Sequence, residues 1–493
     1  MNLTTVYTAI DTPLFHLVGD AASALGQSCH VVGGYVRDLL LNRESKDIDV
    51  TTVGSGIELA TAVKERLGHG AHLHVFQAFG TAQVKQGDTE IEFVGARRES
   101  YRSGSRKPMV ENATFEEDIA RRDFTINAMA ISLTPDSFGT LVDLYGGLDD
   151  LQNKIIRTPL DPDRAFTEDP LRMLRAVRFA CQLGFSIHPV TIESIKRNCD
   201  KVVTLSGERI SDELNKIMKT ERPSVGWWLM LNTGLLKHLI PDLEQLHGVE
   251  IMNGRAHKEN FGHTMQVLDK VAAASDNLWL RWAALLHDVA KPQTKKWDNV
   301  HGWTFHNHNF IGSKMVPRIF RQLKLPMNAD MKYVARMVEL HMRPVALVEE
   351  TVTDSAIRRL ATECGDENTL EELLILCEAD VTSKNQRKVE QCLSNLQLVR
   401  EKLRQLKERD EIRNYRPPVN GLVVKRVFGL SDSPVLKDVI SALKEAYLEG
   451  NITPDYDENF DYMLSTVAPS LGLTPVDTSR HNPSDIKKKK QDN

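Results

Sequence analysis

Apolar and polar residues alternate in several short segments of the first 145 residues, and a helical spacing replaces this alternation further along the chain. The alternation covers residues 47–50, 82–85 and 90–94, and a short apolar run covers residues 29–32. These patterns are typical of strands, whereas residues 35–41 have the spacing of one or two helical turns. From about residue 150 onward the apolar spacing favours helices. The pattern predicts a multidomain chain, with a mixed α/β head followed by an all-α body.

Length and composition narrow the class of protein. The 493 residues predict roughly three or four domains, and 41% hydrophobic with 26% charged residues excludes global disorder. No segment reaches about 18 uninterrupted apolar residues, so we expect no membrane span. The first fifteen residues contain Asp11 and no basic residue, which argues against a secretory signal. Six cysteines without a CxxC pair indicate the reduced thiols of a cytoplasmic protein.

Residues 31–50, VVGGYVRDLLLNRESKDIDV, combine a glycine turn with two carboxylates. Gly33 and Gly34 follow a predicted strand and begin a helix, where backbone N–H groups can approach a phosphate chain. Asp47 and Asp49 are two apart on a predicted strand and share one face. Such a pair suits Mg²⁺ ions that bind a nucleoside triphosphate and activate an attacking hydroxyl. Glu92, on a later predicted strand, is either a third carboxylate of this site or a solvent-facing residue.

Residues 116–132, EEDIARRDFTINAMAIS, contain the next candidates. Arg121 and Arg122 can bind phosphate or ribose, and Asp123 and Asn127 can position them or bond a 2′-hydroxyl. Asp123 and Asn127 are four apart, so one helical face can hold both. The alternative is a cluster of ion pairs on a helix surface.

Residues 167–185, TEDPLRMLRAVRFACQLGF, predict a helix with an N-cap at Asp169 and an end at Gly184. Arg172, Arg175 and Arg178 recur every three residues, and they repel one another unless an anion lies nearby. A carboxylate and a guanidinium three residues apart, Asp169 and Arg172, match the base edges of cytosine and adenine and oppose those of uracil and guanine. The pair can therefore select C and A; a capping aspartate paired with Arg172 is the alternative.

From about residue 28 to 250 the chain resembles the class II tRNA nucleotidyltransferases, or CCA-adding enzymes, and the related poly(A) polymerases. The resemblance rests on GGYVRD with DID, RRDFTINAMA, EDPLRMLRAVRFA and the ERI of GERISDELNKIM, in the family's order. It implies catalytic metals on Asp47 and Asp49. It implies that phosphates and ribose are handled by Gly34, Arg37, Arg121, Arg122 and Asp123. It also implies base pairing by Asp169 and Arg172, with Arg175 and Arg178 nearby, and neck helices braced by Glu208 and Arg209.

One loop departs from the family pattern. The family usually has an acidic residue in a flexible loop before the RRDF block, and this chain has SGSRKP, with Gly104 and Ser105 at that place. The family's loop is thought to help the change from C to A addition. A variant that adds only CC or only A therefore remains an alternative.

A second constellation of possible metal ligands follows in the helical body. Its centre is LLHDVAKP, with His287 and Asp288 near a helix end that we expect Pro292 to stop. The other members are His263, His308, His341 and Asp380. Imidazoles and carboxylates together suit a divalent metal such as Mg, Mn, Ni or Zn. The order resembles the HD phosphohydrolase superfamily, which implies hydrolysis of a phosphoester by metal-bound water.

These patterns predict five segments: a nucleotidyltransferase head at 1–145, a neck at 146–248, an HD domain at 249–395, a tRNA-contacting helical segment at 396–475 and a disordered tail at 476–493. The net charge of −5 excludes a globally basic nucleic-acid binder, but residues 97–107 and Lys487–Lys490 are locally basic. The tail lysines are also typical of a solubilising terminus. In the helical segment, possible phosphate contacts are Lys425, Arg426, Lys437 and Lys444.

The function predicted from these residues is template-independent addition of CCA to tRNA 3′ ends from CTP and ATP, with a possible phosphohydrolase at the HD site. Mg²⁺ at the head and a divalent metal at the HD site are the expected cofactors, and tRNA is the expected partner. The sequence leaves the oligomeric state open. The alternatives are a poly(A) polymerase, an HD phosphohydrolase with a degenerate head, and a non-enzymatic RNA-binding scaffold.

Overall fold

The computed structural model describes residues 3–100, 109–257, 259–344, 354–382, 385–414, 416–431 and 433–480. The chain forms two compact units. One contains the described residues up to Pro344 together with Cys364–Val389, and the other contains those of 354–363 and 390–480. Within the described residues, no helix has both the length and the apolar character needed to cross a membrane.

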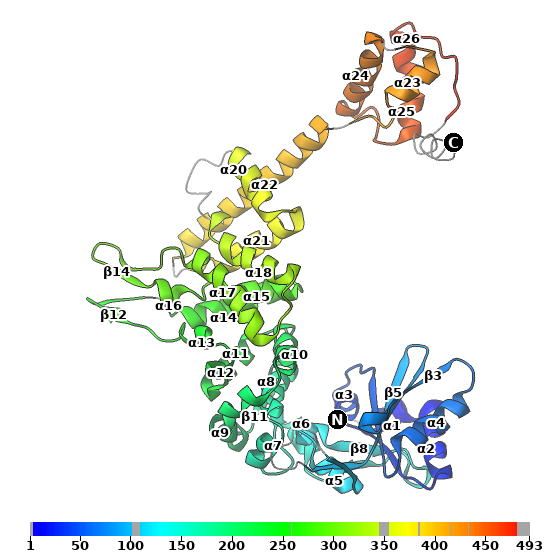
Figure 1. Ribbon diagram of the computed structural model, residues 1–493, viewed down its shortest axis with the longest axis vertical. Coiled ribbons are helices and arrows are strands. Elements are labelled where there is room, and N and C mark those ends of the chain that lie inside the picture. Colours follow the sequence, from blue (N-terminus) through cyan, green and yellow to red (C-terminus); the bar gives the residue numbers. More distant parts are fainter. Residues whose placement is uncertain are drawn as a thin grey trace. The chain divides into compact units, whose positions relative to one another are not determined.

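The head is built on a seven-stranded sheet with the strand order β3-β4-β5-β2-β1-β8-β9. Figure 1 labels β3, β5 and β8 of this sheet. The strands are β1 (Cys29–Val32), β2 (Asp47–Thr52), β3 (Ala71–Phe76), β4 (Thr81–Gln86), β5 (Thr89–Gly95), β8 (Met129–Ser132) and β9 (Leu141–Asp143). Within this described sheet, β2 and β5 pair in parallel and all other neighbours pair antiparallel. The four segments predicted as strands are β1, β2, β4 and β5, so the predicted mixed α/β head is confirmed.

Helices of the head fix the ends of these strands. Helix α2 (Pro13–Ala24) begins at Thr12, whose side chain accepts from the Phe15 amide, and it packs against α4 (Gly56–Leu67). Helix α4 in turn packs on β3, β4 and β5. Helix α3 (Gly34–Leu40) follows β1 directly and contacts β1, β2 and β8. The start of α3 therefore lies beside the acidic strand β2.

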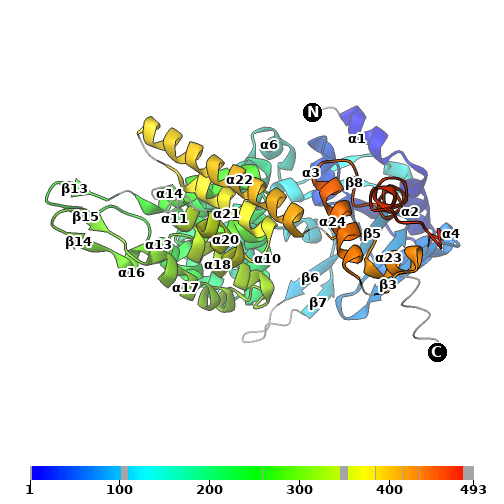
Figure 2. The same cartoon turned by 90° about the horizontal axis from the view of Figure 1, so that it is seen from above.

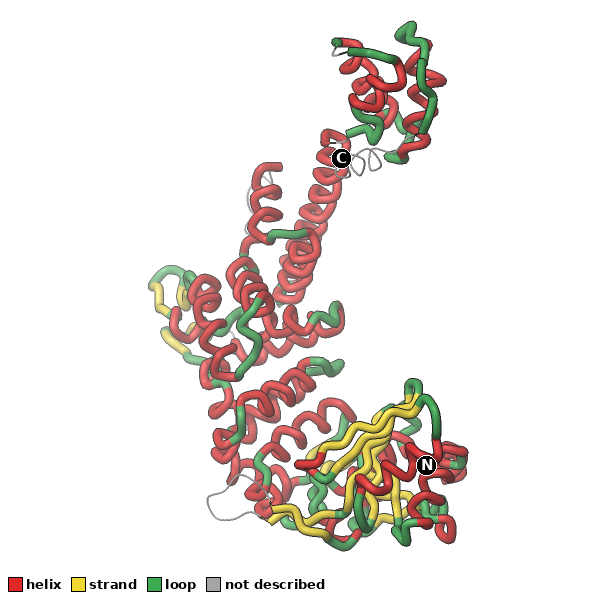
Figure 3. Tube along the Cα trace, turned by 45° about the vertical axis from the view of Figure 1, so that its right-hand side comes forward, coloured by secondary structure: helices red, strands yellow, loops and turns green. Residues whose placement is uncertain are grey.

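The segment after the head is almost entirely helical, as Figure 3 shows. Its main helices are α7 (Pro162–Glu168), α8 (Leu171–Leu183), α9 (Pro189–Asn198), α10 (Gly207–Met218) and α11 (Ser224–Thr233). Helix α8 ends at Gly184, which has a left-handed φ of 68°. The expectation of an all-α body needs a small correction, because β10 (Ile155–Ile156) pairs with β11 (Ser186–Ile187).

The next helices surround the histidines. They are α14 (Asn260–Ala274), α15 (Leu278–Leu286), α17 (His308–Leu323), α18 (Ala329–Leu340) and α21 (Glu367–Asp380). Two hairpins, β12–β13 (Ile251–Met252 with Arg255–Ala256) and β14–β15 (Lys296–Asp298 with Gly302–Thr304), lie side by side (Figure 2). The sequence led us to expect that Pro292 ends the helix of His287, but α15 already ends at Leu286. Pro292 instead lies in the first turn of α16 (Lys291–Thr294), where the backbone N–H that proline lacks would have no helical partner.

The second unit has its own apolar core. Helices α23 (Gly421–Phe428), α24 (Pro434–Leu448) and α25 (Tyr456–Tyr462) enclose Val424, Leu443 and Phe460, and α22 (Gln386–Asn414) precedes them. Residues 476–480, which the sequence analysis placed in a disordered tail, are held against α23, because the Val476 amide donates to the Val427 carbonyl and Arg426 donates to the Ser479 carbonyl. Residues 481–493, with the tail lysines, lie outside the described residues.

Candidate functional site

Three carboxylates lie side by side on two neighbouring strands of the head. Strand β2 places Asp47 and Asp49 on one face, and the parallel register places Glu92 of β5 opposite Asp49. Burial raises the pKa of Asp49 to about 6; Arg122 opposes this shift, and Glu92 and Asp47 add to it. A divalent cation relieves this repulsion, and an all-oxygen donor set is the kind that Mg²⁺ prefers. The residues therefore fit the predicted head metals.

The glycine turn brings a guanidinium to the same place. Gly33 has a φ of +77°, and a Cβ at this residue would lie 2.9 Å from Nη1 of Arg122 and 3.6 Å from Oδ2 of Asp49. Only glycine leaves room for both groups at the start of α3, where Gly34 is the first helical residue. The structure thus brings Gly33, Gly34, Asp49 and Arg122 together.

Asp118, which the sequence reasoning missed, holds both arginines of the Arg-Arg pair. This carboxylate is 1% exposed and accepts from Nη2 of Arg121 at 2.7 Å and from Nη2 of Arg122 at 3.5 Å. The Thr51 hydroxyl donates to the same carboxylate at 3.3 Å. The spacing in the sequence could have indicated this contact. Asp118 lies on α5 (Phe115–Ala120), and Arg121 and Arg122 follow it by three and four residues just after the helix ends.

Asp123 and Asn127 are in contact, but not on one α-helical face as expected. Helix α5 ends before them, and Asn127 lies in a 3₁₀ turn from which its Nδ2 donates to Asp123 at 3.0 Å. Arg37, predicted to handle phosphate or ribose, is 5% exposed and donates to Asn127 and, through two nitrogens, to Asp38. We therefore interpret Arg37 as a support for Asn127.

Carboxylates of the protein neutralise the arginines of α8, and these ion pairs offset the repulsion that the sequence predicted between neighbouring arginines. Arg175 pairs with Asp123 at 2.6 Å, and Arg178 pairs with Glu213 at 2.6 Å. Burial alone would raise the pKa of Asp123, but Arg175 and the Asn127 amide hold that pKa below its usual value. Glu213, 2% exposed, was missed because nothing in its local sequence on α10 marks it as a partner of α8.

The base-selecting candidates lie at a cleft of about 460 Å³. The lining includes Glu117, Arg121, Arg122, Leu160, Arg164, Glu168, Asp169 and Arg172. Asp169 accepts from the Leu171 amide at the start of α8, as the capping alternative expected, but its ion pair is with Arg209 at 2.9 Å and not with Arg172. Arg172 donates to the Arg121 carbonyl at 2.5 Å. Arg175 and Arg178 are not among the residues that line this cleft.

The SGSRKP loop, residues 103–108, lies outside the described residues, as do Arg102, Arg106 and Lys107 of the basic segment. The strands on either side, β6 (Arg97–Ser100) and β7 (Met109–Asn112), pair antiparallel. The hypothesis of a CC-only or A-only variant therefore gains no support from this segment.

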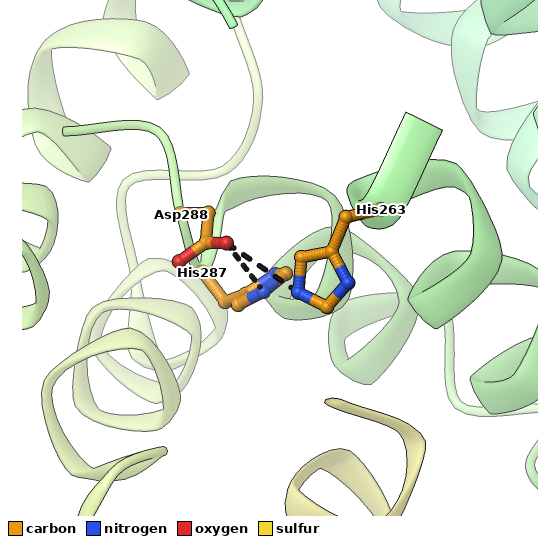
Figure 4. Close-up of side chains that lie close together, drawn as sticks. All are labelled: His263, His287 and Asp288. Atoms are coloured by element: carbon orange, nitrogen blue, oxygen red, sulfur yellow. Dashed lines mark ion pairs between the residues drawn. The ribbon is translucent and has the colours of Figure 1, made fainter. Parts of the chain in front are cut away.

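The structure brings the predicted HD residues together from five helices or their ends. Figure 4 shows that His263 and His287 both face Asp288, with Nε2 of His287 3.2 Å and Nε2 of His263 3.6 Å from its Oδ2. Asp380, at the end of α21, accepts from His263 at 2.8 Å. The ligand atoms of His263, His287 and Asp288 lie within 4.8 Å of one another, and so do those of Asp288, His308 and His341.

The protonation of this cluster depends on its carboxylates. Burial lowers the pKa of His287, but Asp288 and Asp380 outweigh it and raise that pKa to about 10. Burial lowers the pKa of His341 to about 4. Lys291, which the sequence reasoning did not single out, contacts Asp288 at 2.6 Å. The buried imidazoles and the carboxylates offer nitrogen and oxygen donors, a set that suits Mn, Ni or Zn better than Mg, so the residues fit a transition metal.

Three protein families match this chain. They are the Poly A polymerase head domain at residues 29–157, the "Probable RNA and SrmB- binding site of polymerase A" at 184–246 and the HD domain at 260–385. The three matches follow one another without overlap and cover most of the first structural unit.

Curated relatives are tRNA nucleotidyltransferases. An A-adding tRNA nucleotidyltransferase of Aquifex aeolicus is 44% identical over 39% of this chain, which spans only 23% of that protein's length. The Multifunctional CCA protein of Vibrio parahaemolyticus is 33% identical, with 71% of this chain and 84% of the relative covered. An A-adding tRNA nucleotidyltransferase of Deinococcus radiodurans is 30% identical, with 86% and 92% covered.

A solved structure of a tRNA nucleotidyltransferase is also similar to this chain. A tRNA nucleotidyltransferase in complex with a primer tRNA and an incoming ATP analogue has a TM-score of 0.56 and 27% identity, over 79% of this chain and 99% of that one. The fold found here is therefore one that accommodates a primer tRNA and a nucleotide in that protein.

Proposed function

Because the chain belongs to the tRNA nucleotidyltransferase family, we propose that it adds cytidine and adenosine to the 3′ end of tRNA from CTP and ATP. The observation that supports this activity best is the position of Asp49, opposite Glu92 on the next strand and against the glycine turn that admits Arg122. This arrangement joins a metal-binding carboxylate set to a phosphate-binding cation, as nucleotidyl transfer requires.

In the proposed reaction, the 3′-hydroxyl of tRNA attacks the α-phosphorus of the nucleotide in line. A new O–P bond forms, the bond to the bridging oxygen of the β-phosphate breaks, and pyrophosphate leaves. Asp47, Asp49 and Glu92 would hold the Mg²⁺ ions, which supply charge neutralisation and lower the pKa of the attacking hydroxyl. Arg121 and Arg122, oriented by Asp118, bind the triphosphate oxygens.

Base selection is assigned to Asp169 and Arg172 at the cleft beside the Arg-Arg pair. Asp169 uses one oxygen for the Leu171 amide and the other for Arg209, so its orientation is fixed while lone pairs remain for an amino group of cytosine or adenine. Arg172 is anchored by the Arg121 carbonyl, which lies at the end of α5 in the head. The two side chains present one acceptor and one donor without having to pair with each other.

An enzyme that adds only A is the second candidate. It is favoured by the 44% identity to the Aquifex A-adding relative and by the Deinococcus A-adding relative, of which this chain covers 92%.

A gel assay separates these readings. Purified protein and Mg²⁺ are incubated with tRNA lacking the last three nucleotides and with tRNA ending in CC, each with CTP, ATP or both. Addition of two C and one A supports CCA addition, whereas addition of A only to the CC-ended tRNA establishes the A-adding activity. A long ladder with ATP alone would mean poly(A) synthesis, and no extension of either tRNA would refute the proposal.

The HD centre supports a second activity, hydrolysis of a phosphoester. When bound, a divalent metal there would supply a hydroxide nucleophile at neutral pH. His263, His287, Asp288 and Asp380 would hold it, and Lys291, 2.6 Å from Asp288, can bind an oxygen of the phosphate. The test is release of phosphate from p-nitrophenyl phosphate or opening of a 2′,3′-cyclic phosphate after Mn²⁺ or Ni²⁺ is added; no turnover with either metal would refute it. A cytoplasmic location is proposed because the described residues, which include all six cysteines, contain no disulfide bond.

A further inference from the structure

Four aromatic rings, the hairpin aromatics, lie edge to face with one another on the two hairpins beside the HD centre. Trp297 and Trp303 are opposite each other on β14 and β15, with ring centroids 5.3 Å apart at 79°. His257, which follows β13 in the other hairpin, meets Trp303 at 5.7 Å and Phe305 at 6.0 Å. All four side chains are partly exposed. They form one continuous group on hairpins that project from the same side of the helices (Figures 1 and 2).

Phe305 connects the hairpin aromatics to the HD centre. Its carbonyl lies 2.8 Å from Nδ1 of His308. Its ring centroid lies 5.8 Å from Nζ of Lys291, and the same Nζ is 2.6 Å from Oδ2 of Asp288. One ammonium group therefore separates the HD carboxylate from the first aromatic ring.

Cations accompany the rings along the hairpins. Nζ of Lys295 lies 5.2 Å from the ring centroid of Trp303, and the same lysine forms an ion pair with Glu250 just before β12. Residues 250–257 and 291–306 contain four Lys or Arg and two Asp or Glu, although the net charge of the whole chain is −5. Aromatic rings combined with cations are typical of surfaces that stack nucleobases and contact phosphates.

The hairpins do not bury their apolar side chains as a small structural core would. Ile251 and Val300 are 72% and 75% exposed. The excess of basic over acidic residues beside these apolar groups favours an anionic ligand with flat apolar faces, and a nucleotide combines both properties.

We propose that the hairpin aromatics bind the base of a nucleotide whose phosphate enters the HD centre. The ligand is a nucleoside phosphate, either free or at the end of a single-stranded RNA, because an unpaired base can offer its face for stacking. Lys291 and Lys295 would contact the phosphate oxygens. The role of this ligand as a substrate rests on the proposed phosphoester hydrolysis, whereas its binding can be tested without turnover.

Photocrosslinking tests the site without hydrolysis. The full-length chain, stripped of metal with a chelator, is mixed with a short RNA that ends in 5-iodouridine and a 3′-phosphate, or with 5-iodouridine 3′-monophosphate. Irradiation joins the iodinated base to an aromatic side chain that it touches, and mass spectrometry identifies that side chain. We expect crosslinks at Trp303 or Trp297. Excess unlabelled uridine 3′-monophosphate should suppress them, and glycerol 2-phosphate, which has no base, should not.

Variants of one ring make the test quantitative. Trp303→Leu should raise the nucleotide concentration that half-saturates crosslinking by about tenfold, whereas Trp303→Phe, which keeps a ring, should stay within about threefold of the parent. Phe310→Leu is the matched control. Phe310 is 51% exposed and has Nζ of Lys314 5.2 Å from its ring centroid, but it lies on α17 outside the hairpins. If Trp303→Leu fails to fold, as judged by circular dichroism, the position of the crosslink in the parent chain decides alone.

The position of the crosslink decides whether the hairpins bind a base. Crosslinks confined to the head or to residues 390–480, or an equal loss of affinity in Trp303→Leu and Phe310→Leu, would overturn the inference. Self-association that depends on Trp303, without crosslinking, would overturn it in favour of a contact between two copies of the chain. Tighter binding of the RNA than of the mononucleotide would support a strand end as the ligand, and equal binding would support a free nucleotide.

The same experiment keeps this inference apart from the proposed hydrolysis. A hairpin crosslink in a chain that hydrolyses no phosphoester would count against the hydrolysis alone. Hydrolysis of glycerol 2-phosphate without a hairpin crosslink would count against the base-binding site alone.

Discussion

The Asp169 carboxylate is joined to the guanidinium of Arg209 by a 2.9 Å ion pair, whereas Arg172, three residues further on in the first turn of α8, donates to the Arg121 carbonyl. The Asp169–Arg209 pair connects the start of α8 to the first turn of α10. Both side chains are partly exposed, at 29% and 49%, so the pair contributes little to folding and its main effect is to orient Asp169.

Arg209→Ala should therefore reduce the discrimination between nucleotides more than it reduces the stability of the fold. Without the ion pair the Asp169 carboxylate rotates more freely, and we expect the kcat/KM ratio of CTP over UTP to fall by roughly tenfold, which corresponds to about 1.4 kcal/mol. The free energy of unfolding should change by less than about 1 kcal/mol. Arg209→Lys, which keeps the charge, should restore part of the discrimination. Unchanged nucleotide choice in Arg209→Ala would contradict the orienting role.

Arg172→Ala tests the other half of the proposed base-reading pair. If the proposal holds, loss of the guanidinium removes the donor for cytosine and adenine, and we expect misincorporation of UTP or GTP to rise by about ten- to a hundredfold relative to CTP. Single-nucleotide extension assays with each triphosphate would measure it. Arg164→Ala, at the same cleft but 70% exposed in its side chain, is the matched control and should leave base choice as it is. Equal discrimination in the two variants would refute the role of Arg172.

Asp49→Asn should abolish addition while tRNA binding persists. The change removes a charge that is proposed to bind metal at the position opposite Glu92, and loss of a metal contribution of several kcal/mol should lower kcat by about 10³-fold or more. Gel extension measures addition, and filter binding measures tRNA affinity. Asp88→Asn, in the exposed turn between β4 and β5, is the control. Near-normal addition by Asp49→Asn would remove it from the metal site.

Asp118→Asn should act through the two arginines that it holds. The amide keeps the shape but loses the charge, so Arg121 and Arg122 become mobile; we expect KM for the nucleotide to rise by about tenfold with a smaller change in kcat. Thr51→Val removes only the neutral 3.3 Å hydrogen bond to the same carboxylate and serves as the control. Steady-state kinetics with CTP and a tRNA that lacks its terminal CCA would measure kcat and the KM for the nucleotide. An equal effect of the two variants would mean that Asp118 only supports folding.

Local patterns in the sequence were sufficient to predict four of the seven strands of the head sheet and to select residues that the structure brings together at the two candidate centres. The alternation of polar and apolar residues within two strands was enough to select Asp47, Asp49 and Glu92 as candidates. The register of the sheet then places these carboxylates together. The HD residues follow a known order, although their helices are far apart in the chain. In these cases residue type and spacing along single elements determine the arrangement.

Partners across elements could not be predicted in the same way. Arg178 meets Glu213 and Asp169 meets Arg209 because α8 packs against α10, and no spacing rule in one segment specifies which side chains meet at such an interface. The sequence reasoning also expected an α-helix through Asp123 and Asn127, whereas the chain makes a 3₁₀ turn there, with Phe124 fully buried. Tertiary packing overrides local spacing at these positions.

The two active centres should be separable by one substitution. Asp288→Asn removes the charge that both groups of HD histidines share, so we expect it to eliminate metal-dependent phosphoester hydrolysis. The carboxylates of the head, on β2 and β5, share no hydrogen bond or ion pair with Asp288 among the described contacts, so CCA addition should stay within about twofold of the parent. Both activities are measured on one preparation, with circular dichroism to verify folding. Loss of addition together with hydrolysis would mean that Asp288 maintains the fold, and retention of both would mean that hydrolysis takes place elsewhere.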